Sequence, residues 1–387
     1  NFVKLSLTSR PIKLIGKTFL TSIIFGLIGF LIFTSDDLSI SSDFLAYYTG
    51  ALMVKDGQGE SLYDIPAQVS YQQKIVEFSE IKSLPFRYLP FVGVFFVPFS
   101  YLPISTSYII FGILNIFFLF LIYFLCKRIF KNLKDSLFLG LVIFAFLPNI
   151  LAIALGQTSL ILSLGFLSYY ILIKRKNYFL AGLCSSLIFF KVQYLVIIPF
   201  LFLIVKDKRA FILGFASSLI VLTLISVYIS GFEGLLKYPM FVLNTENSDF
   251  ATKYWQSFSL NSLPMGLSFF RDNSVYLFLS AGILYLMTLL FFAVNVKKLG
   301  VEKSFVFATL ATAIFSMHTL VHDLAFLTVP ILILLNQDRR NDNILLAGVL
   351  FLIPFAASFI DNASWAPVVF FLSAIFLFRE RILTRQP

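Results

Sequence analysis

Residues 104–134 read ISTSYIIFGILNIFFLFLIYFLCKRIFKNLK. The part from Ile104 to Cys126 has no charged side chain, and it is long enough for the ~20 apolar residues that an α-helix needs to cross a bilayer. The basic side chains that follow directly are Lys127, Arg128, Lys131 and Lys134. An apolar run that ends in such a cluster is typical of a membrane-spanning helix with its basic end in the cytoplasm.

The rest of the chain has the same character. Of its 387 residues, 59% are hydrophobic and 13% are charged, and the mean hydropathy is +0.90. A soluble domain is usually about half apolar and about a quarter charged, so a water-soluble core could not hide this much apolar surface. The net charge of +10 comes mostly from clusters between apolar runs, which indicates membrane topology and no nucleic-acid partner. We therefore predict an all-α polytopic membrane protein.

About 12 segments are predicted to cross the membrane, each near or somewhat below the usual ~20 residues, within one domain that covers residues 1–387. These predicted spans are 14–34, 104–126, 136–155, 158–173, 178–191, 194–205, 210–230, 275–296, 304–318, 324–336, 344–360 and 365–378. A further apolar piece, 89–101, contains Pro90 and Pro98 and is expected to be broken or re-entrant. The basic clusters then all fall on the cytoplasmic side, together with both termini.

Two long connections, 35–88 and 231–274, are expected on the extracytoplasmic side. Loops of this length in a compact protein are usually functional. Residues 61–80 carry Leu62, Ile65, Val69, Ile75 and Val76 among polar positions, which suits a helix along the membrane surface.

Asp43 follows the first predicted span, in the sequence Ser42-Asp43-Phe44. Aromatic neighbours would partly desolvate a carboxylate at the membrane surface, and this favours a general base. The alternative is a helix N-cap, because Ser and Asp are preferred there.

Three more polar residues interrupt apolar sequence on the same predicted side. Gln157, in Gly156-Gln157-Thr158-Ser159, either binds a hydroxylated ligand or belongs to a plain turn. Lys191 and Arg87 either hold a phosphate as compact cations or extend harmlessly to the membrane surface.

The loop 244–264 combines aromatic, amide and hydroxyl groups, among them Trp255 and Asn261. Such a mixture suits sugar recognition, although an interfacial aromatic belt has a similar composition. His318 and His322 are spaced i, i+4 beside Asp323. They could share a metal, orient a phosphate or serve the structure; because no usual third ligand is evident, no metal and no cofactor is predicted.

Taken in order, these pieces resemble glycosyltransferase family 87. The resemblance rests on short matches spread over nearly the whole chain: Asp43-Phe44, Tyr47-Tyr48, Leu62-Tyr63-Asp64, Tyr88-Leu89-Pro90-Phe91, Gly156-Gln157, Lys191-Val192-Gln193, Asn261-Ser262 and His318 through Asp323. It implies the multispanning GT-C fold and a polyprenyl-phosphate-sugar-dependent, inverting hexosyltransferase of the cell (inner) membrane. The sugar would be mannose, and the acceptor a glycolipid or glycan on the extracytoplasmic face.

The resemblance also implies roles for single residues. Asp43 would be the catalytic base, and Lys191, His322 and Arg87 would bind the phosphate of the lipid-linked donor. The remaining substrate-binding candidates are Gln157, Gln193, Asn261, His318 and Trp255.

Two other classes of protein fit the same apolar composition. A transporter or lipid flippase would place ionisable residues near the bilayer midplane and often shows internal repeats, whereas the charges here lie near span ends. A cell-envelope glycan polymerase or ligase also has many spans and a large outer loop; here the large loop follows the first span, as the resemblance expects.

Overall fold

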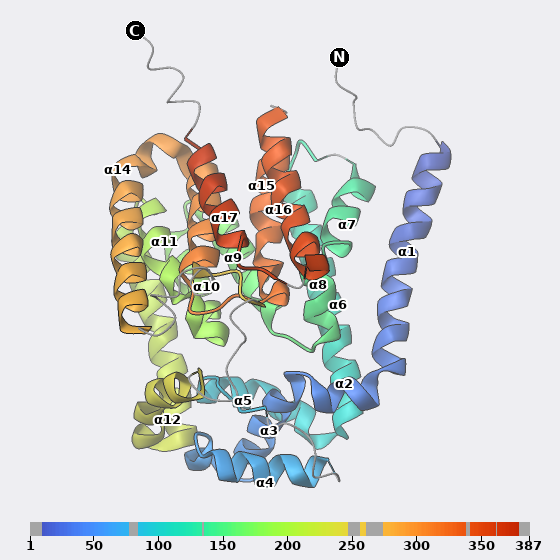
Figure 1. Ribbon diagram of the computed structural model, residues 1–387, viewed down its shortest axis with the longest axis vertical. Helices are drawn as coiled ribbons and strands as arrows, with labels where there is room; N and C mark the ends of the chain where they lie inside the picture. The colour runs from blue at the N-terminus through green and yellow to red at the C-terminus, as the bar shows by residue number, and fades with distance from the viewer. Residues whose placement is uncertain are drawn as a thin grey trace.

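The computed structural model describes residues 10–76, 84–133, 135–246, 256–260, 274–337, 341–360 and 362–378. All regular structure in these ranges is helical. Long helices stand side by side in a bundle, and a layer of short helices lies across one end of it (Figure 1). The predicted all-α membrane architecture is therefore confirmed in its class.

The end layer is built mostly from residues that precede the second predicted span, and the end of α12 (Lys208–Glu246) lies beside them (Figure 1). Its helices are α2 (Ser35–Ser41), α3 (Phe44–Lys55), η1 (Gly59–Ser61), α4 (Ile65–Ile75), α5 (Pro90–Phe96) and η2 (Val97–Tyr101). Pro90 begins α5 and Pro98 lies in the first turn of η2, so both prolines sit where a missing N–H is tolerated. The described part of the predicted loop 35–88 is thus largely helical, and 89–101 forms two short helices.

The first upright helices are α1 (Arg10–Phe33), α6 (Ile104–Ile129), α7 (Ser136–Phe144), α8 (Leu147–Ala154) and α9 (Ser159–Lys174). α7 and α8 meet at a bend of 54° just before Pro148, so the predicted span 136–155 is one bent unit.

Three long helical stretches are interrupted by single residues with non-helical backbone. The first runs through α10 (Tyr178–Ser185), η3 (Ser186–Ile197) and α11 (Ile198–Ile204), and it breaks at Lys191. The second, α12 (Lys208–Glu246), breaks at Gly231, and the third, α14 (Ser274–Phe315), breaks at Gly300.

The breaks at Lys191 and Gly300 turn the chain back on itself. Across Gly300, the rings of Phe292 and Phe307 stack with centroids 5.1 Å apart. The two sides of the Lys191 break both lie along α9. Before the break, a Cβ on Gly165 would lie 3.0 Å from Cβ of Leu187, and after it Leu201 accepts a hydrogen bond from the Tyr169 hydroxyl at 2.7 Å. Both stretches are therefore helical hairpins, as the separate predicted spans 178–191 and 194–205, or 275–296 and 304–318, require. α12 differs from the prediction, because it continues as a helix beyond Gly231 into the predicted loop 231–274.

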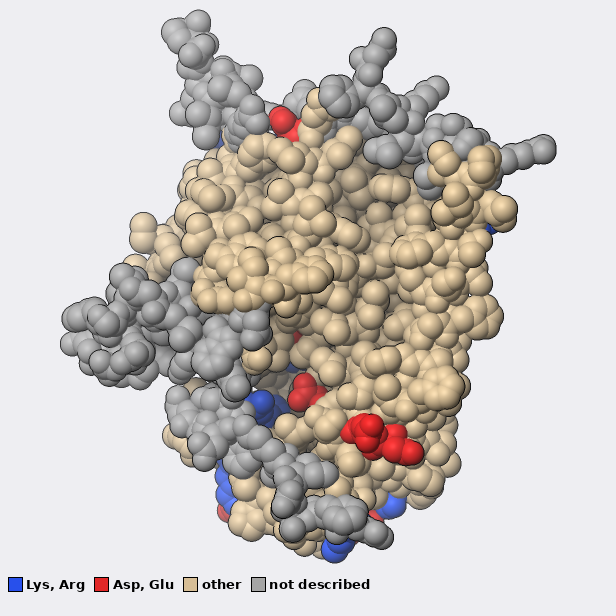
Figure 2. All heavy atoms as spheres, turned by 45° about the vertical axis from the view of Figure 1, so that its right-hand side comes forward, with Lys and Arg blue, Asp and Glu red and all other residues tan. Residues whose placement is uncertain are grey.

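The chain ends with η6 (Val321–Leu327), α15 (Thr328–Asn336), α16 (Asn341–Ile360) and α17 (Ala366–Phe376). Within the described ranges, 6 helices are long and apolar enough to cross a membrane, or 7 with the bent α7–α8 pair. Each predicted span falls on helix, while the number of crossings stays a prediction. In Figure 2 the charged atoms gather toward the two ends, with a broad uncharged belt between them.

Contacts at the end opposite the short-helix layer bring basic clusters together. Lys174 at the end of α9 pairs with Glu302, next to the break in α14. Asn132 after α6 hydrogen-bonds Asn336 at the end of α15, with N to Oδ1 at 3.0 Å and Nδ2 to O at 2.7 Å. These clusters therefore share one end of the bundle, as the charge pattern predicts.

α10 and α12 cross at two glycines. A Cβ atom on Gly182 would lie 2.1 Å from the carbonyl oxygen of Phe211, and one on Gly214 would lie 1.9 Å from that of Phe179. Small residues at such crossings let helix backbones approach closely inside a membrane.

We expect Gly182→Ala to lower the free energy of unfolding by about 3 kcal/mol, because the added methyl group meets backbone that cannot rotate away. Unfolding in mixed micelles of rising SDS content measures this. Gly282→Ala is the matched control, since no atom lies within 4 Å of its added Cβ. Equal stability of both variants would contradict the close crossing.

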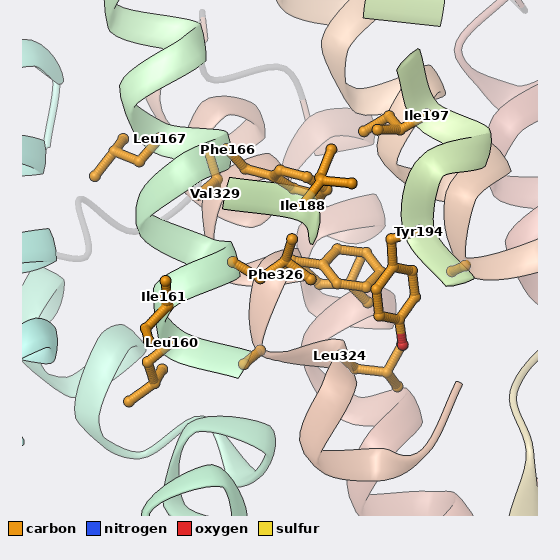
Figure 3. Packing of buried hydrophobic residues seen from close by; sticks show 14 of the residues in the cluster. Leu160, Ile161, Phe166, Leu167, Ile188, Tyr194, Ile197, Leu324, Phe326 and Val329 are labelled. Atoms are coloured by element: carbon orange, nitrogen blue, oxygen red, sulfur yellow. The ribbon is translucent and has the colours of Figure 1, made fainter. Parts of the chain in front are cut away.

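A buried aromatic and aliphatic core lies where α9, η3 and η6 meet (Figure 3). The ring of Phe326 packs against Phe166 and Tyr194, with both centroid distances at 5.4 Å. This core holds the beginnings of α9 and η6 and the Lys191 turn in fixed relation, and these are the three places that supply the polar side chains described next.

Candidate active site

A cavity of about 450 Å³ lies where the short-helix layer meets the bundle. Its wall is formed by the α2–α3 turn, the end of α8, residues 256–260, the start of η6 and the α16–α17 connection. Figure 2 shows acidic and basic atoms together in a hollow below the uncharged belt. Asp43 and His322 both line the cavity, so two predicted site residues from distant parts of the chain share one space.

Asp43 is at the N-cap position of α3, but its side chain makes no capping bond. Ser42 Oγ instead accepts from the N–H of Phe44 at 3.4 Å. The half-buried Asp43 carboxylate accepts a hydrogen bond through Oδ2 from Nε2 of Gln157. Asp43 therefore stands at the N-cap position of α3, but its side chain does not cap the helix.

The turn between α8 and α9 brings Gln157 to Asp43. Gly156 has φ +59°, and a Cβ there would lie 2.9 Å from Cβ of Phe44, so glycine serves both the turn and the close approach. Asn115 on α6 donates to the carbonyl of Gln157 at 3.2 Å. The Gln157 N–H donates to Ala152 at 2.8 Å. These bonds fix the backbone from which the amide projects.

Lys191 lies behind Gln157, at the break between the two halves of its hairpin. Only 4% of its side chain is exposed. Its Nζ donates to Oε1 of Gln157 at 2.9 Å and forms an ion pair with Oδ1 of Asp323, which is 1% exposed. Lys191 is not among the residues that line the cavity. In this geometry its charge is directed to Asp323 and Gln157.

Asp323 is held from several directions at the start of η6. Its Oδ2 accepts from the N–H of Leu320 at 3.0 Å, and its Oδ1 accepts from Ser159 Oγ at 3.3 Å. His322 Nε2 lies 3.5 Å from the same Oδ1. The carboxylate therefore joins the beginnings of η6 and α9 to the Lys191 turn.

Tyr47 on α3 adds a second donor to Gln157, with its hydroxyl 3.3 Å from Oε1 and 3.1 Å from Thr158 Oγ1. Burial raises the pKa of the Tyr47 hydroxyl above its ordinary value, so it keeps its proton at neutral pH. Its ring stacks between Tyr88 and Phe96, at centroid distances of 4.4 and 4.6 Å.

Three of the other predicted residues lie in the described part of the chain. His318 and Gln193 face each other, with their Nε2 atoms 3.5 Å apart. The carbonyl of Arg87 accepts from Tyr238 at 3.4 Å, and Arg87 itself is not a lining residue of the cavity. Trp255 and Asn261 lie outside the described residues.

Sequence reasoning gave no role to Tyr47, Ser159 or Asp323 as partners in this network. Gln256 and Phe258, which line the cavity, belong to the loop 244–264, whose aromatic and amide groups predict sugar recognition. The Phe258 N–H donates to the Thr319 carbonyl at 2.7 Å and so ties this segment to the start of η6. For Tyr47, Ser159 and Asp323 the available signal was position, since all three lie in or beside predicted outer segments.

The site offers a half-buried carboxylate and an imidazole on one cavity. In the described part of the chain, no three His, Cys, Asp or Glu side chains are grouped closely enough to hold a metal ion. The Asp43 carboxylate can take a proton, and the His322 imidazole can donate a hydrogen bond.

Comparisons with known proteins add one finding. The family model of glycosyltransferase family 87 matches residues 86–322, which is more than half of the chain. The match includes Gln157, Lys191 and His322 and begins after Asp43. Searches of curated proteins and of solved structures gave no match.

Proposed function

The chain belongs to glycosyltransferase family 87, and from this premise we propose that it transfers mannose from a polyprenyl-phosphate carrier to a glycolipid or glycan on the extracytoplasmic face of the cell membrane. Asp43 acts as the general base in this proposal, and His322 binds the donor phosphate.

One observation carries the proposal: Asp43 and His322 line the same cavity at one end of an apolar bundle. A lipid-linked sugar has an apolar chain and a charged, hydrophilic head. A cavity at the edge of the membrane-spanning helices can take the head while the chain stays in the bilayer. The basic clusters support the choice of face, because α9 extends about 24 Å from Ser159 at the site to Lys174 at the opposite end.

The chemistry is a single displacement at the anomeric carbon. The acceptor hydroxyl attacks this carbon, its proton passes to Asp43, and the bond to the phosphate oxygen breaks. The leaving polyprenyl phosphate gains negative charge as it departs, so a hydrogen bond from His322 stabilises the transition state more than the bound donor. The attack from the opposite side inverts the anomeric configuration.

The donor class can be tested with the wild-type protein. Purified protein in detergent is supplied with a membrane lipid extract and either tritiated mannosyl polyprenyl phosphate or tritiated nucleotide-linked mannose. We expect label in a new product from the lipid-linked donor only, because the proposed cavity serves a head group held at the membrane. The control is protein denatured by heat before the reaction.

Three outcomes separate the classes of function. Transfer from the nucleotide-linked sugar alone would overturn the proposed donor. With the same protein reconstituted into vesicles, movement of labelled lipid from one leaflet to the other without a new product would indicate a flippase. Long chains of added sugars would indicate a polymerase.

A further inference from the structure

The side-chain amide of Gln157 has different partners at its two ends. Its Oε1 faces hydrogen-bond donors, and its Nε2 faces the Asp43 carboxylate. Lys191 Nζ and the Tyr47 hydroxyl, at 2.9 and 3.3 Å, are both donors toward Oε1. An ammonium group has no acceptor atom, so turning the Nε2 end of Gln157 toward Lys191 would lose the bond from Nζ and leave a buried cation facing an N–H group. With Oε1 fixed by these donors, Nε2 is left to face Asp43.

The position of Lys191 is fixed in turn by Asp323. Both side chains are almost fully buried, and a buried charge is costly unless it is paired and hydrogen-bonded. Asp323 meets this need for Lys191 and is itself held by the Leu320 N–H and by Ser159. The pair therefore gives the Lys191 ammonium one position, directly behind the Gln157 amide.

We propose that the buried Lys191–Asp323 pair is a positioning element that orients the Gln157 amide, so that Nε2 donates to Oδ2 of Asp43 and Oδ1 is left to receive the acceptor proton. This inference rests on the proposed function, in which Asp43 is the base. It gives Lys191 and Gln157 a different role from the expected binding of the donor phosphate, because they act through Asp43.

A flipped amide would place Oε1 against the Asp43 carboxylate, oxygen against oxygen. The carboxylate would then lose its donor and could rotate away from the acceptor hydroxyl. Small losses of alignment at a reacting group can cost ~10²-fold in rate. The pair thus affects the chemical step while the donor head group binds elsewhere on the cavity wall.

Two variants test this role with tritiated mannosyl polyprenyl phosphate as the donor. Gln157→Glu keeps an oxygen for Lys191 and replaces the Nε2 donor with a second oxygen. Lys191→Met/Asp323→Asn removes both charges together and keeps an acceptor for the Leu320 N–H. We expect kcat to fall ~10–100-fold in both, with KM for the donor within about twofold of wild type.

The matched control is Thr312→Val, because Thr312 is fully buried and its hydroxyl donates only within its own helix, to Ala308 at 2.7 Å. We expect wild-type kcat for this variant. Size-exclusion profiles and SDS unfolding curves show whether each variant is folded.

The decisive measurement repeats both variants in an Asp43→Asn background. Residues that act only through Asp43 should cause less than about threefold further loss there, because their effect requires the carboxylate. Full additivity, or a rise in KM with unchanged kcat, would overturn the inference and indicate direct contact with the donor. If Asp43→Asn alone keeps wild-type kcat, the base assignment fails instead, so the two failures are distinguishable.

Discussion

Asp43→Asn is expected to lower kcat by about 10²–10⁴-fold, which is the usual contribution of a positioned general base. The amide cannot take the proton of the acceptor hydroxyl, so the attacking oxygen must lose it to water. The substitution keeps the size of the side chain and an oxygen that can accept from Gln157 Nε2. We therefore expect the folded structure and the KM for the donor to be retained. Initial rates with tritiated mannosyl polyprenyl phosphate measure the effect.

Asp36→Asn is the matched control for this result. Asp36 lies on α2, close to Asp43 in sequence, but it is exposed and does not line the cavity. We expect its kcat to equal that of the wild type. Equal losses in the two variants would indicate a general effect of charge at the membrane surface, and wild-type activity of Asp43→Asn would show that another group is the base.

Much of the fold could be predicted because the bilayer constrains it so strongly. An apolar run between basic clusters must become a helix, since hydrocarbon offers its backbone no other hydrogen-bonding partner. The interruption at Lys191 was predictable for the same reason: a charged residue divides an otherwise apolar stretch. The end layer was not predictable in detail. Its helices lie outside this constraint, and the continuation of α12 beyond Gly231 depends on local packing.

The sequence could predict which residues belong to the site, but it could not predict which of them contact one another. Polar side chains such as Gln157 and Lys191 are conspicuous in a chain this apolar. Their partners are set by tertiary structure, since Gln157 and Asp43 are separated by 114 positions and Lys191 and Asp323 by 132. The pairing of Lys191 with Asp323 needs the η3 hairpin and η6 to share one core, and no local pattern encodes that contact (Figure 3).

Lys191→Met alone is expected to lower the free energy of unfolding by about 3–5 kcal/mol, because it leaves the Asp323 carboxylate buried without its cation. Asp323 is 1% exposed and lies among packed side chains, so water cannot replace the ammonium group without opening this part of the core. The hydrogen bonds from Leu320 and Ser159 would remain and would offset only part of the loss. SDS unfolding curves of the wild type and the variant measure the difference.

The same reasoning predicts the opposite result when both charges are removed. A buried ion pair adds little stability over neutral groups of similar size, because the cost of removing the charges from water offsets most of their attraction. Lys191→Met/Asp323→Asn should therefore unfold within about 1 kcal/mol of the wild type, although it lacks more of the native network than the single variant does. If the double variant were as unstable as Lys191→Met, the pair would serve stability directly. If it recovers stability but not kcat, then the chain keeps this buried pair for the orientation that it imposes on Gln157 and Asp43.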